Sequence, residues 1–338
     1  MKKSYEEFVE AVFRAVEVIC KDQPKKVLLQ KVVKNNDTVL DALNLTDENT
    51  KISPTIYLNH FYEVYEQGKS IEEIAKEVYD LYRKNERRYH FKGDEFSEFD
   101  QVKNNIAFRL VNTKLNQKLL GDVPHRTFLD LSLIYYVVLN MEEECGHWME
   151  GCEAGRSNAS VLIHNSHLSM WECKEEELYQ FAWKNTRKLY PEVIRSMEEL
   201  LSSLLVEDLE RDSYLREETT SYDAMDLKEE ALQEVRELNE HRSELQMYVL
   251  TNIAKLHGAS CVLYDQVLAR FSEKVDCDLF ILPSSIHEVI LVPARTGICK
   301  RELDQMVKEV NQEAVDPEEI LSDHAYYYHR KEDQIRMA

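Results

Sequence analysis

The sequence predicts an α+β protein, with helices and mainly antiparallel strands in separate stretches of the chain. Two observations carry this prediction. Apolar residues recur at three- and four-residue steps in several segments, two of which begin with capping boxes, and this spacing is typical of amphipathic helices. In addition, Leu279–Leu282 and Val289–Val292 are short, continuous apolar runs joined by a polar turn. That pattern is typical of strands buried on both faces, so we expect Ile281 and Ile290 in a core.

The first section, residues 1–88, is expected to be a small α+β unit. A capping box at residues 4–7 precedes an apolar stripe that predicts a helix of about five turns. Polar residues 34–37 separate two apolar runs, which indicates a hairpin, and residues 54–59 follow as a third strand. A second capping box, at residues 70–73, predicts another helix.

The middle section, residues 101–206, is predicted to be a sheet with two helices. Its strands are expected at 106–111, 129–139 and 161–163 and its helices at 178–185 and 191–204, the latter opened by Pro191. Residues 207–244 follow with fourteen acidic and five basic side chains and one thin apolar stripe. We interpret this segment as an acidic connector helix, with a disordered linker as the alternative.

The last section, residues 245–338, is predicted to be a C-terminal α+β domain. A strand at 247–250 and a helix at 261–275 precede the two apolar strands, and a helix at 303–310 and a terminal hairpin at 325–337 follow them. The order β-α-β-β-α-β is typical of a split βαβ arrangement, a mainly antiparallel sheet with helices on one face. Such a fold implies no function by itself.

Charge and cysteine content limit the possible partners and the compartment. The 338 residues carry a net charge of -21, which argues against a nucleic-acid binder and an anionic membrane surface and leaves a basic protein partner. The apolar run at 129–139 is too short to span a bilayer, and residues 1–7 show no signal-peptide core. Seven irregularly spaced cysteines do not suggest a disulfide framework. We therefore expect a cytoplasmic protein with reduced thiols; the sequence sets no oligomeric state.

Five strings together carry a family resemblance: Pro54–Asn59, Leu110–Thr113, Asp122–Arg126, Met247–Asn252 and Leu282–Glu288. With this set the chain resembles a bacterial family catalogued as domain of unknown function 5688, and the likeness covers nearly the whole chain. The resemblance implies a bacterial intracellular protein. It brings no assigned activity, cofactor or catalytic residue.

The turn between the two apolar strands gathers the densest set of reactive side chains: Ser284, Ser285, His287 and Glu288. They could supply a nucleophile, a base and an orienting carboxylate, with His125 contributed from the middle section. Neighbouring side chains in a tight turn diverge, however, and the chain has no Gly-x-Ser-x-Gly elbow. The alternative is that the serines bond the backbone of the turn while the histidine pairs locally.

The one metal-like cluster in the sequence contains Cys145, His147 and Cys152, which Cys173 or His164 could complete as a zinc site. Structural zinc sites usually bring ligands as close pairs, so we favour an exposed acidic loop and no metal. The sequence also contains neither a Gly-x-x-x-x-Gly-Lys nor a Gly-x-Gly-x-x-Gly loop, and we expect no cofactor.

The pattern as a whole favours a non-enzymatic interaction or regulatory module with an acidic surface. The alternative is a hydrolase-like or transferase-like enzyme whose site lies at residues 284–288. A pocket that unites these groups would distinguish the two.

Overall fold

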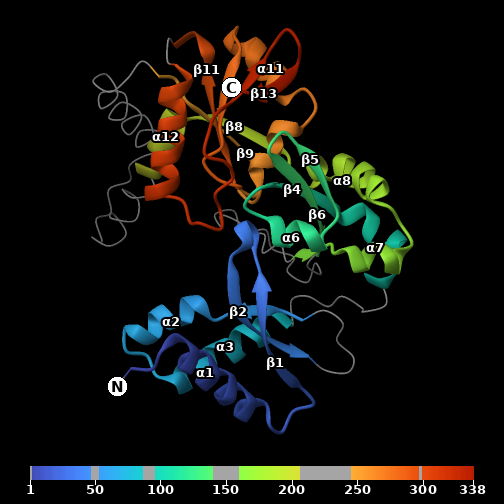
Figure 1. The fold of residues 1–338 in the computed structure, drawn as a ribbon, viewed down its shortest axis with the longest axis vertical. Helices are drawn as coiled ribbons and strands as arrows, with labels where there is room; N and C mark the ends of the chain where they lie inside the picture. The colour runs from blue at the N-terminus through green and yellow to red at the C-terminus, as the bar shows by residue number, and fades with distance from the viewer. Residues whose placement is uncertain (1, 47–52, 87–95, 140–159, 206–244, 297–298) are drawn as a thin grey trace, which may run out of the picture. The chain divides into compact units, whose positions relative to one another are not determined.

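In the computed structural model the chain divides into two units, Met1–Leu189 and Tyr190–Ala338 (Figure 1). The structure describes residues 2–46, 53–86, 96–139, 160–205, 245–296 and 299–338. Helices and antiparallel sheets occur in both units, which confirms the predicted α+β class. The segment 207–244 lies outside the described residues, so its expected helix stays a prediction.

The N-terminal part of unit 1 is a three-stranded antiparallel sheet packed against helices. Its elements are α1 (Tyr5–Cys20), β1 (Lys26–Val33), β2 (Val39–Thr46), β3 (Thr55–Tyr57), α2 (Asn59–Glu66) and α3 (Ile71–Glu86). Both predicted capping boxes form, at residues 4–7 and 70–73. The apolar stripe of α1, including the fully buried Phe8 and Val12, packs with Leu43 of β2 and Ile74 of α3. The predicted hairpin and third strand are therefore confirmed, whereas α2 was not predicted.

A second sheet in unit 1 is centred on a strand that is buried along its whole length. The elements are α5 (Phe99–Val102), β4 (Ile106–Asn112), α6 (Gln117–Asp122), β5 (His125–Phe128), β6 (Leu131–Val138), β7 (Ser160–Leu162), α7 (Asn165–Trp171) and α8 (Glu175–Leu189). Helix α8 covers one face, where Trp183 stacks on Phe108 and the Thr186 hydroxyl accepts the backbone N–H of Phe108 at 3.0 Å. The strand predicted at 129–139 begins two residues later, because Leu129 adopts a positive φ of 55° in the turn after β5.

The tip of the β1–β2 hairpin joins the two sheets of unit 1. The Asn36 N–H donates to Oδ1 of the fully buried Asn116 at 2.7 Å. The Asp37 carboxylate accepts the backbone N–H groups of Lys118 and Leu119 at 2.9 and 3.1 Å. These N–H groups belong to the first turn of α6 and have no partner within that helix. The hairpin tip thus supplies the cap that α6 lacks locally.

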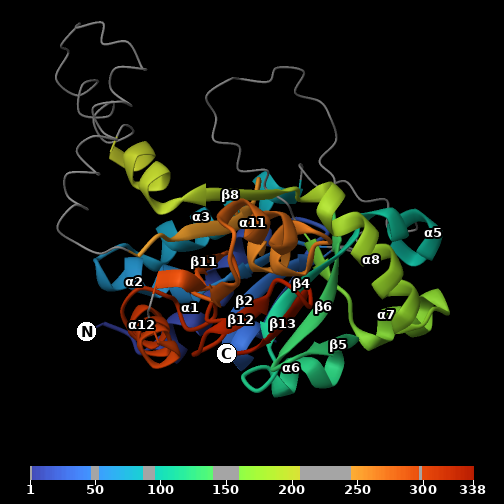
Figure 2. The ribbon, with the colours of Figure 1, turned by 90° about the horizontal axis from the view of Figure 1, so that it is seen from above.

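Unit 2 is built on a six-stranded antiparallel sheet in the order β13-β12-β10-β11-β9-β8. Its elements are β8 (Glu192–Ser196), β9 (Tyr248–Asn252), the 3-10 helix η3 (Gly258–Leu263), α11 (Val267–Val275), β10 (Leu279–Leu282), β11 (Val289–Pro293), α12 (Lys300–Glu313), β12 (Tyr326–His329) and β13 (Gln334–Met337). Figure 2 shows β8 at the edge of this sheet. The predicted core position Ile281 is 2% exposed, while Ile290 is half-buried.

The split βαβ arrangement occurs twice in unit 2, and the two crossover helices contact different faces of the sheet. Phe271 of α11 packs edge-on against Tyr248 of β9. Leu303 of α12 packs in a cluster with Leu282 and Val292, which alternate with the residues on the Tyr248 face. The antiparallel sheet is confirmed, but these two helices do not share one face. The β9–α11–β10 and β11–α12–β12 connections run in the same direction across the sheet, but β9 and β11 are antiparallel to each other. Because such crossover connections are right-handed, the two helices lie on opposite faces of the sheet.

Two predicted helices of the later sections are corrected by the structure. Residues 192–196, expected in a helix opened by Pro191, form β8, and the helix covers only 197–205 of the described residues. The helix predicted at 261–275 is interrupted, because Gln266 adopts a positive φ of 65° between η3 and α11. In both places a strand or a turn comes directly before the apolar pattern of a helix, and no change in that pattern marks where the helix begins.

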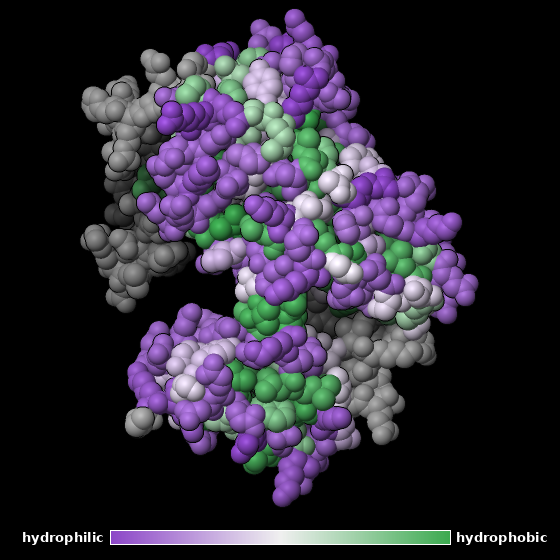
Figure 3. Space-filling view, in the orientation of Figure 1, coloured by the Kyte–Doolittle hydropathy of each residue, from purple (hydrophilic) through white to green (hydrophobic). Residues whose placement is uncertain are grey.

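The visible surface is mostly hydrophilic, and α12 presents polar side chains to solvent (Figure 3). Hydrophobic side chains gather over β1 and β2 of unit 1, where Leu28 and Val39 are 36% and 43% exposed. None of the helices in the described part of the chain is long and apolar enough to cross a membrane.

Candidate functional site

The turn between β10 and β11 is held by two other segments of unit 2. The Ile286 N–H donates to the carbonyl of Glu319, which precedes β12, at 2.9 Å. On the other side, the Ala259 N–H donates to the Ile286 carbonyl at 3.3 Å, and the Thr251 hydroxyl donates to the His287 carbonyl at 2.8 Å. The turn therefore bridges the end of β9 and the segment before β12.

Both ring nitrogens of His287 are engaged. Nδ1 lies 3.2 Å from the backbone nitrogen of His257 and accepts its N–H, and Nε2 lies 3.2 Å from Oε1 of Glu319. Because Nδ1 is an acceptor, the neutral ring carries its proton on Nε2 and donates it to the carboxylate. The ring also stacks on that of His257, with centroids 5.5 Å apart and an interplanar angle of 13°. We call His257, His287 and Glu319 the histidine clamp.

The loop that carries His257 is fixed before it meets the turn. Oδ1 of Asn252 accepts the N–H groups of Ala254 and Leu256 at 3.0 and 3.3 Å, and its Nδ2 donates to the Leu256 carbonyl at 2.8 Å. Lys255 and His257 both have positive φ angles, of 52° and 54°. Such angles are uncommon in residues other than glycine and persist where the surroundings enforce them. The side chain of Asn252 thus preorganises residues 253–257.

The two serines of the turn do not form a relay with the imidazole. Ser285 Oγ accepts the backbone N–H of His287 at 3.0 Å, as the local alternative expected. Ser284 Oγ is buried without a hydrogen-bond partner among the described residues. No hydrogen bond in this part of the structure joins either hydroxyl to the His287 ring. Glu288 is half-buried, and Glu319, 32 residues further along the chain than His287, pairs with the histidine instead.

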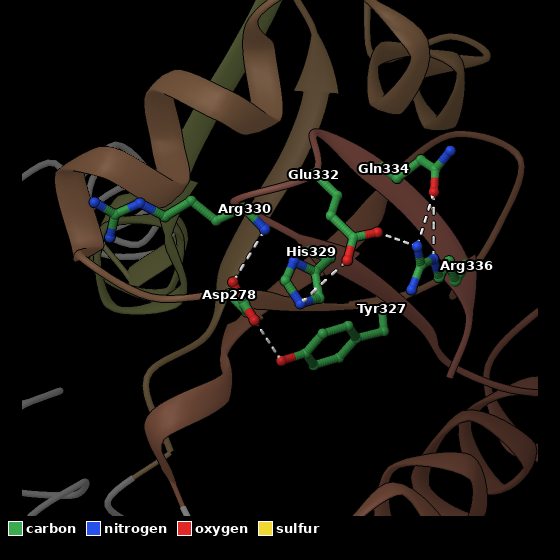
Figure 4. A network of polar contacts seen from close by, with 7 residues as sticks. All are labelled: Asp278, Tyr327, His329, Arg330, Glu332, Gln334 and Arg336. Atoms are coloured by element: carbon green, nitrogen blue, oxygen red, sulfur yellow. Dashed lines mark hydrogen bonds and ion pairs between the residues drawn. The ribbon is translucent and has the colours of Figure 1, made fainter.

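A second polar network occupies the opposite end of β10 (Figure 4). Asp278, the residue before β10, accepts the Tyr327 hydroxyl at 2.7 Å and the Arg330 backbone N–H at 3.0 Å. Burial opposes ionisation of Asp278, but these hydrogen bonds outweigh it and hold the pKa of Asp278 below its usual range. Burial and the hydrogen bond to Asp278 raise the pKa of Tyr327 to about 12.

The rest of this network ties the terminal hairpin together. Arg330 pairs with Asp276 at 2.6 Å. Figure 4 shows Glu332, which accepts from Arg336 and lies 3.9 Å from Nε2 of His329. These ion pairs connect residues in and beside β10, β12 and β13, and all of them are partly exposed to solvent.

His125 and Arg126 lie in unit 1, whereas the turn lies in unit 2. His125 is exposed, and its Nδ1 lies 3.1 Å from the Val123 carbonyl. Arg126 holds Glu175 with two nitrogens at 3.2 and 2.9 Å and stacks over the Tyr179 ring at 3.7 Å. Arg126 therefore forms an ion pair with Glu175 of α8.

The metal candidates Cys145, His147 and Cys152 lie outside the described residues. Of their possible companions, His164 bonds Asp122 through Nδ1 at 2.7 Å, and Cys173 is half-buried with a pKa raised by burial. Within the described ranges, no group of three or more histidine, cysteine or acidic side chains is placed to hold a metal ion.

The comparisons with known proteins point to a single family. A family model described as "Family of unknown function (DUF5688)" matches residues 5–330, nearly the whole chain. No curated protein and no solved structure matches the chain.

Proposed function

The chain belongs to the DUF5688 family, whose function is unknown, and we propose from its own geometry that it is a non-enzymatic interaction or regulatory module of the bacterial cytoplasm. One observation carries the proposal: both ring nitrogens of His287 are engaged, by the His257 N–H and by Glu319. A general base needs a nitrogen free to take the substrate's proton. The densest reactive cluster of the chain therefore acts as a connection between segments.

The preorganised loop beside the histidine clamp is the surface that we propose for the partner. Ile253 is 53% exposed at the start of the Asn252-fixed loop, and the side chain of Glu319, which pairs with His287 in the clamp, is 38% exposed. A rigid loop loses little conformational entropy on binding, which favours affinity. The net charge of -21 favours a basic protein as partner, with association that weakens as salt increases.

Partner binding is tested with two matched substitutions of exposed apolar residues. Ile253→Asp alters the proposed surface, and Val18→Asp alters a 72% exposed position on α1 of unit 1. Cross-linking in cells identifies a basic partner, which is then purified and titrated against each variant. We expect Ile253→Asp to raise the dissociation constant at least about tenfold, which corresponds to a loss of about 1.4 kcal/mol in binding free energy. Val18→Asp should leave the dissociation constant unchanged. Equal effects of both substitutions would contradict the proposed surface.

The enzymatic alternative rests on Ser284, whose buried hydroxyl has no hydrogen-bond partner among the described residues. A fluorophosphonate probe labels serines that an adjacent base activates. We expect no labelling of the intact protein. The control is Ser203→Ala, which removes a half-buried helix serine whose hydroxyl bonds the Glu199 carbonyl. Labelling that disappears in Ser284→Ala but persists in Ser203→Ala would establish an activated nucleophile and overturn the proposal.

A further inference from the structure

The hydrogen bond between the His257 N–H and Nδ1 of His287 exists only while that nitrogen is unprotonated. Nδ1 accepts at 3.2 Å, and the other nitrogen already donates to Glu319. We propose that the histidine clamp is a pH-sensitive latch, which holds the 253–257 loop on the β10–β11 turn at neutral pH and releases it in acid. The latch operates in the isolated chain and therefore goes beyond the proposed function. Its opening can be measured without a binding partner.

Whether acid opens or closes the clamp depends on which of the two states binds a proton on Nδ1 of His287 more tightly. A proton on Nδ1 of the closed clamp would face the His257 N–H, donor against donor, and would place an imidazolium parallel to the stacked ring of His257. In the released state Nδ1 takes a proton without either cost. The released state therefore binds the proton more tightly, and acid increases its population.

Charged groups in the three packed segments act on this equilibrium in both directions. Glu319 stabilises the protonated ring of His287. Because its carboxylate already accepts a hydrogen bond from the neutral ring, protonation adds only the attraction between opposite charges. Glu288 of the turn and Glu318 of the segment before β12 also attract a cation. On the loop, Lys255 repels it. Loss of the Nδ1 acceptor and this repulsion both act on the loop, which is why the loop and not the turn is released.

Release is confined to the loop by contacts that carry no titratable group. The Ile286–Glu319 and Ala259–Ile286 backbone bonds and the Thr251–His287 bond hold the turn in either state. Asn252 keeps residues 254–256 together through its own three bonds. Residues 254–257 therefore move together, while the bond from the Ile253 N–H to the Pro191 carbonyl holds the start of the loop. The bond from the His257 N–H to His287 is the one that breaks.

Amide hydrogen exchange of His257 measures the latch directly. Release of the loop removes the donor that faces Nδ1 of His287 on the turn, so proton uptake drives opening, and we expect the opening equilibrium to increase roughly tenfold between about pH 7.5 and pH 5.5. After correction for the intrinsic exchange rate, we expect protection of this amide to fall by that factor, while amides of β10 keep theirs. A constant protection factor across this range would overturn the latch.

Three substitutions separate His287 from other titrating groups. In His287→Asn the amide oxygen occupies a position similar to Nδ1 and accepts the same N–H, but it does not titrate, so protection should persist and lose its pH dependence. His257→Asn keeps the backbone donor and tolerates a positive φ, and the tenfold fall should remain. His125→Asn in unit 1 should change nothing. A fall that survives His287→Asn, or that disappears in His257→Asn, would refute the assignment to Nδ1 of His287.

Discussion

At the scale of single residues, Gly258 shows how little space separates the loop from the turn. A Cβ at this position would lie 2.5 Å from the His287 carbonyl oxygen and 2.8 Å from the Asn252 nitrogen, both backbone atoms that cannot rotate away. We expect Gly258→Ala to lower the free energy of unfolding by about 1–3 kcal/mol, the usual cost of overpacking. Urea denaturation measures the change.

Gly121 in α6 is the matched control for this substitution. Nothing lies within 4 Å of a Cβ built there. Alanine has the higher helix propensity, so Gly121→Ala should be neutral or stabilise by up to about 1 kcal/mol. A Gly258→Ala variant as stable as Gly121→Ala would show that the loop yields easily and is not preorganised.

Tyr327 gives a prediction in alkali. Burial and the hydrogen bond to Asp278 raise its pKa to about 12, above the ordinary value near 10. Its stabilising contribution is therefore complete below about pH 10 and is lost as the pH rises toward 12. We expect Tyr327→Phe to cost about 1–3 kcal/mol at pH 8, because its hydroxyl bonds a charged group. The difference in unfolding free energy between the variant and the wild-type protein should shrink between about pH 10 and 12 in denaturant titrations; a constant difference would contradict the raised pKa.

The sequence located one part of the candidate site and could not locate the rest. Ser285 and His287 stood out because they lie together in a polar turn between apolar strands. Glu319 and His257 carried no such signal, since each is a polar residue in a polar loop and only tertiary folding places it beside the turn. An ion pair or ring stack between segments about 30 residues apart leaves no periodic pattern.

At the scale of elements, the β1–β2 hairpin tip stabilises a helix far from it in sequence. Asp37 accepts two N–H groups of the first turn of α6. We expect Asp37→Ala to cost about 0.5–2 kcal/mol, the range for loss of an N-terminal cap. Asp22→Ala, at an exposed position before β1, should be neutral. Equal stability of the two variants in thermal denaturation would mean that solvent caps α6 equally well.

An element could be predicted from the sequence when it was long and when capping or turn residues marked its ends. The 16-residue helices α1 and α3 and the β1–β2 hairpin had clear periodicity and clear caps, and all were found. The short elements β5, α6 and α7 span between four and seven residues, too few to establish a period. Strand β8 was misassigned because Val193 and Ile194 continue into the apolar pattern of the next helix without a break.

At the scale of the whole chain, the location of β8 changes where the C-terminal folding unit is expected to begin. The sequence places that boundary at residue 245. In the structure, β8 pairs with β9 along five residues. Just before it, the Tyr190 carbonyl accepts the buried Tyr264 hydroxyl at 3.1 Å, and the Pro191 carbonyl accepts the Ile253 N–H at 3.0 Å. We propose that the independent unit is 190–338.

Three fragments test this boundary: 190–338, 206–338 and 245–338. The first keeps β8, the second removes it but retains the acidic segment, and the third removes both. We expect 190–338 to unfold cooperatively in urea and the two shorter fragments to be less stable by several kcal/mol, at about 1 kcal/mol for each lost hydrogen bond. The edge of β9 would also be unpaired in both, which favours aggregation.

If 206–338 and 190–338 unfold at the same urea concentration while 245–338 does not, the acidic segment and not β8 completes the unit. If all three unfold alike, residue 245 is the true boundary, and the contacts of Tyr190, Pro191 and β8 add nothing to folding.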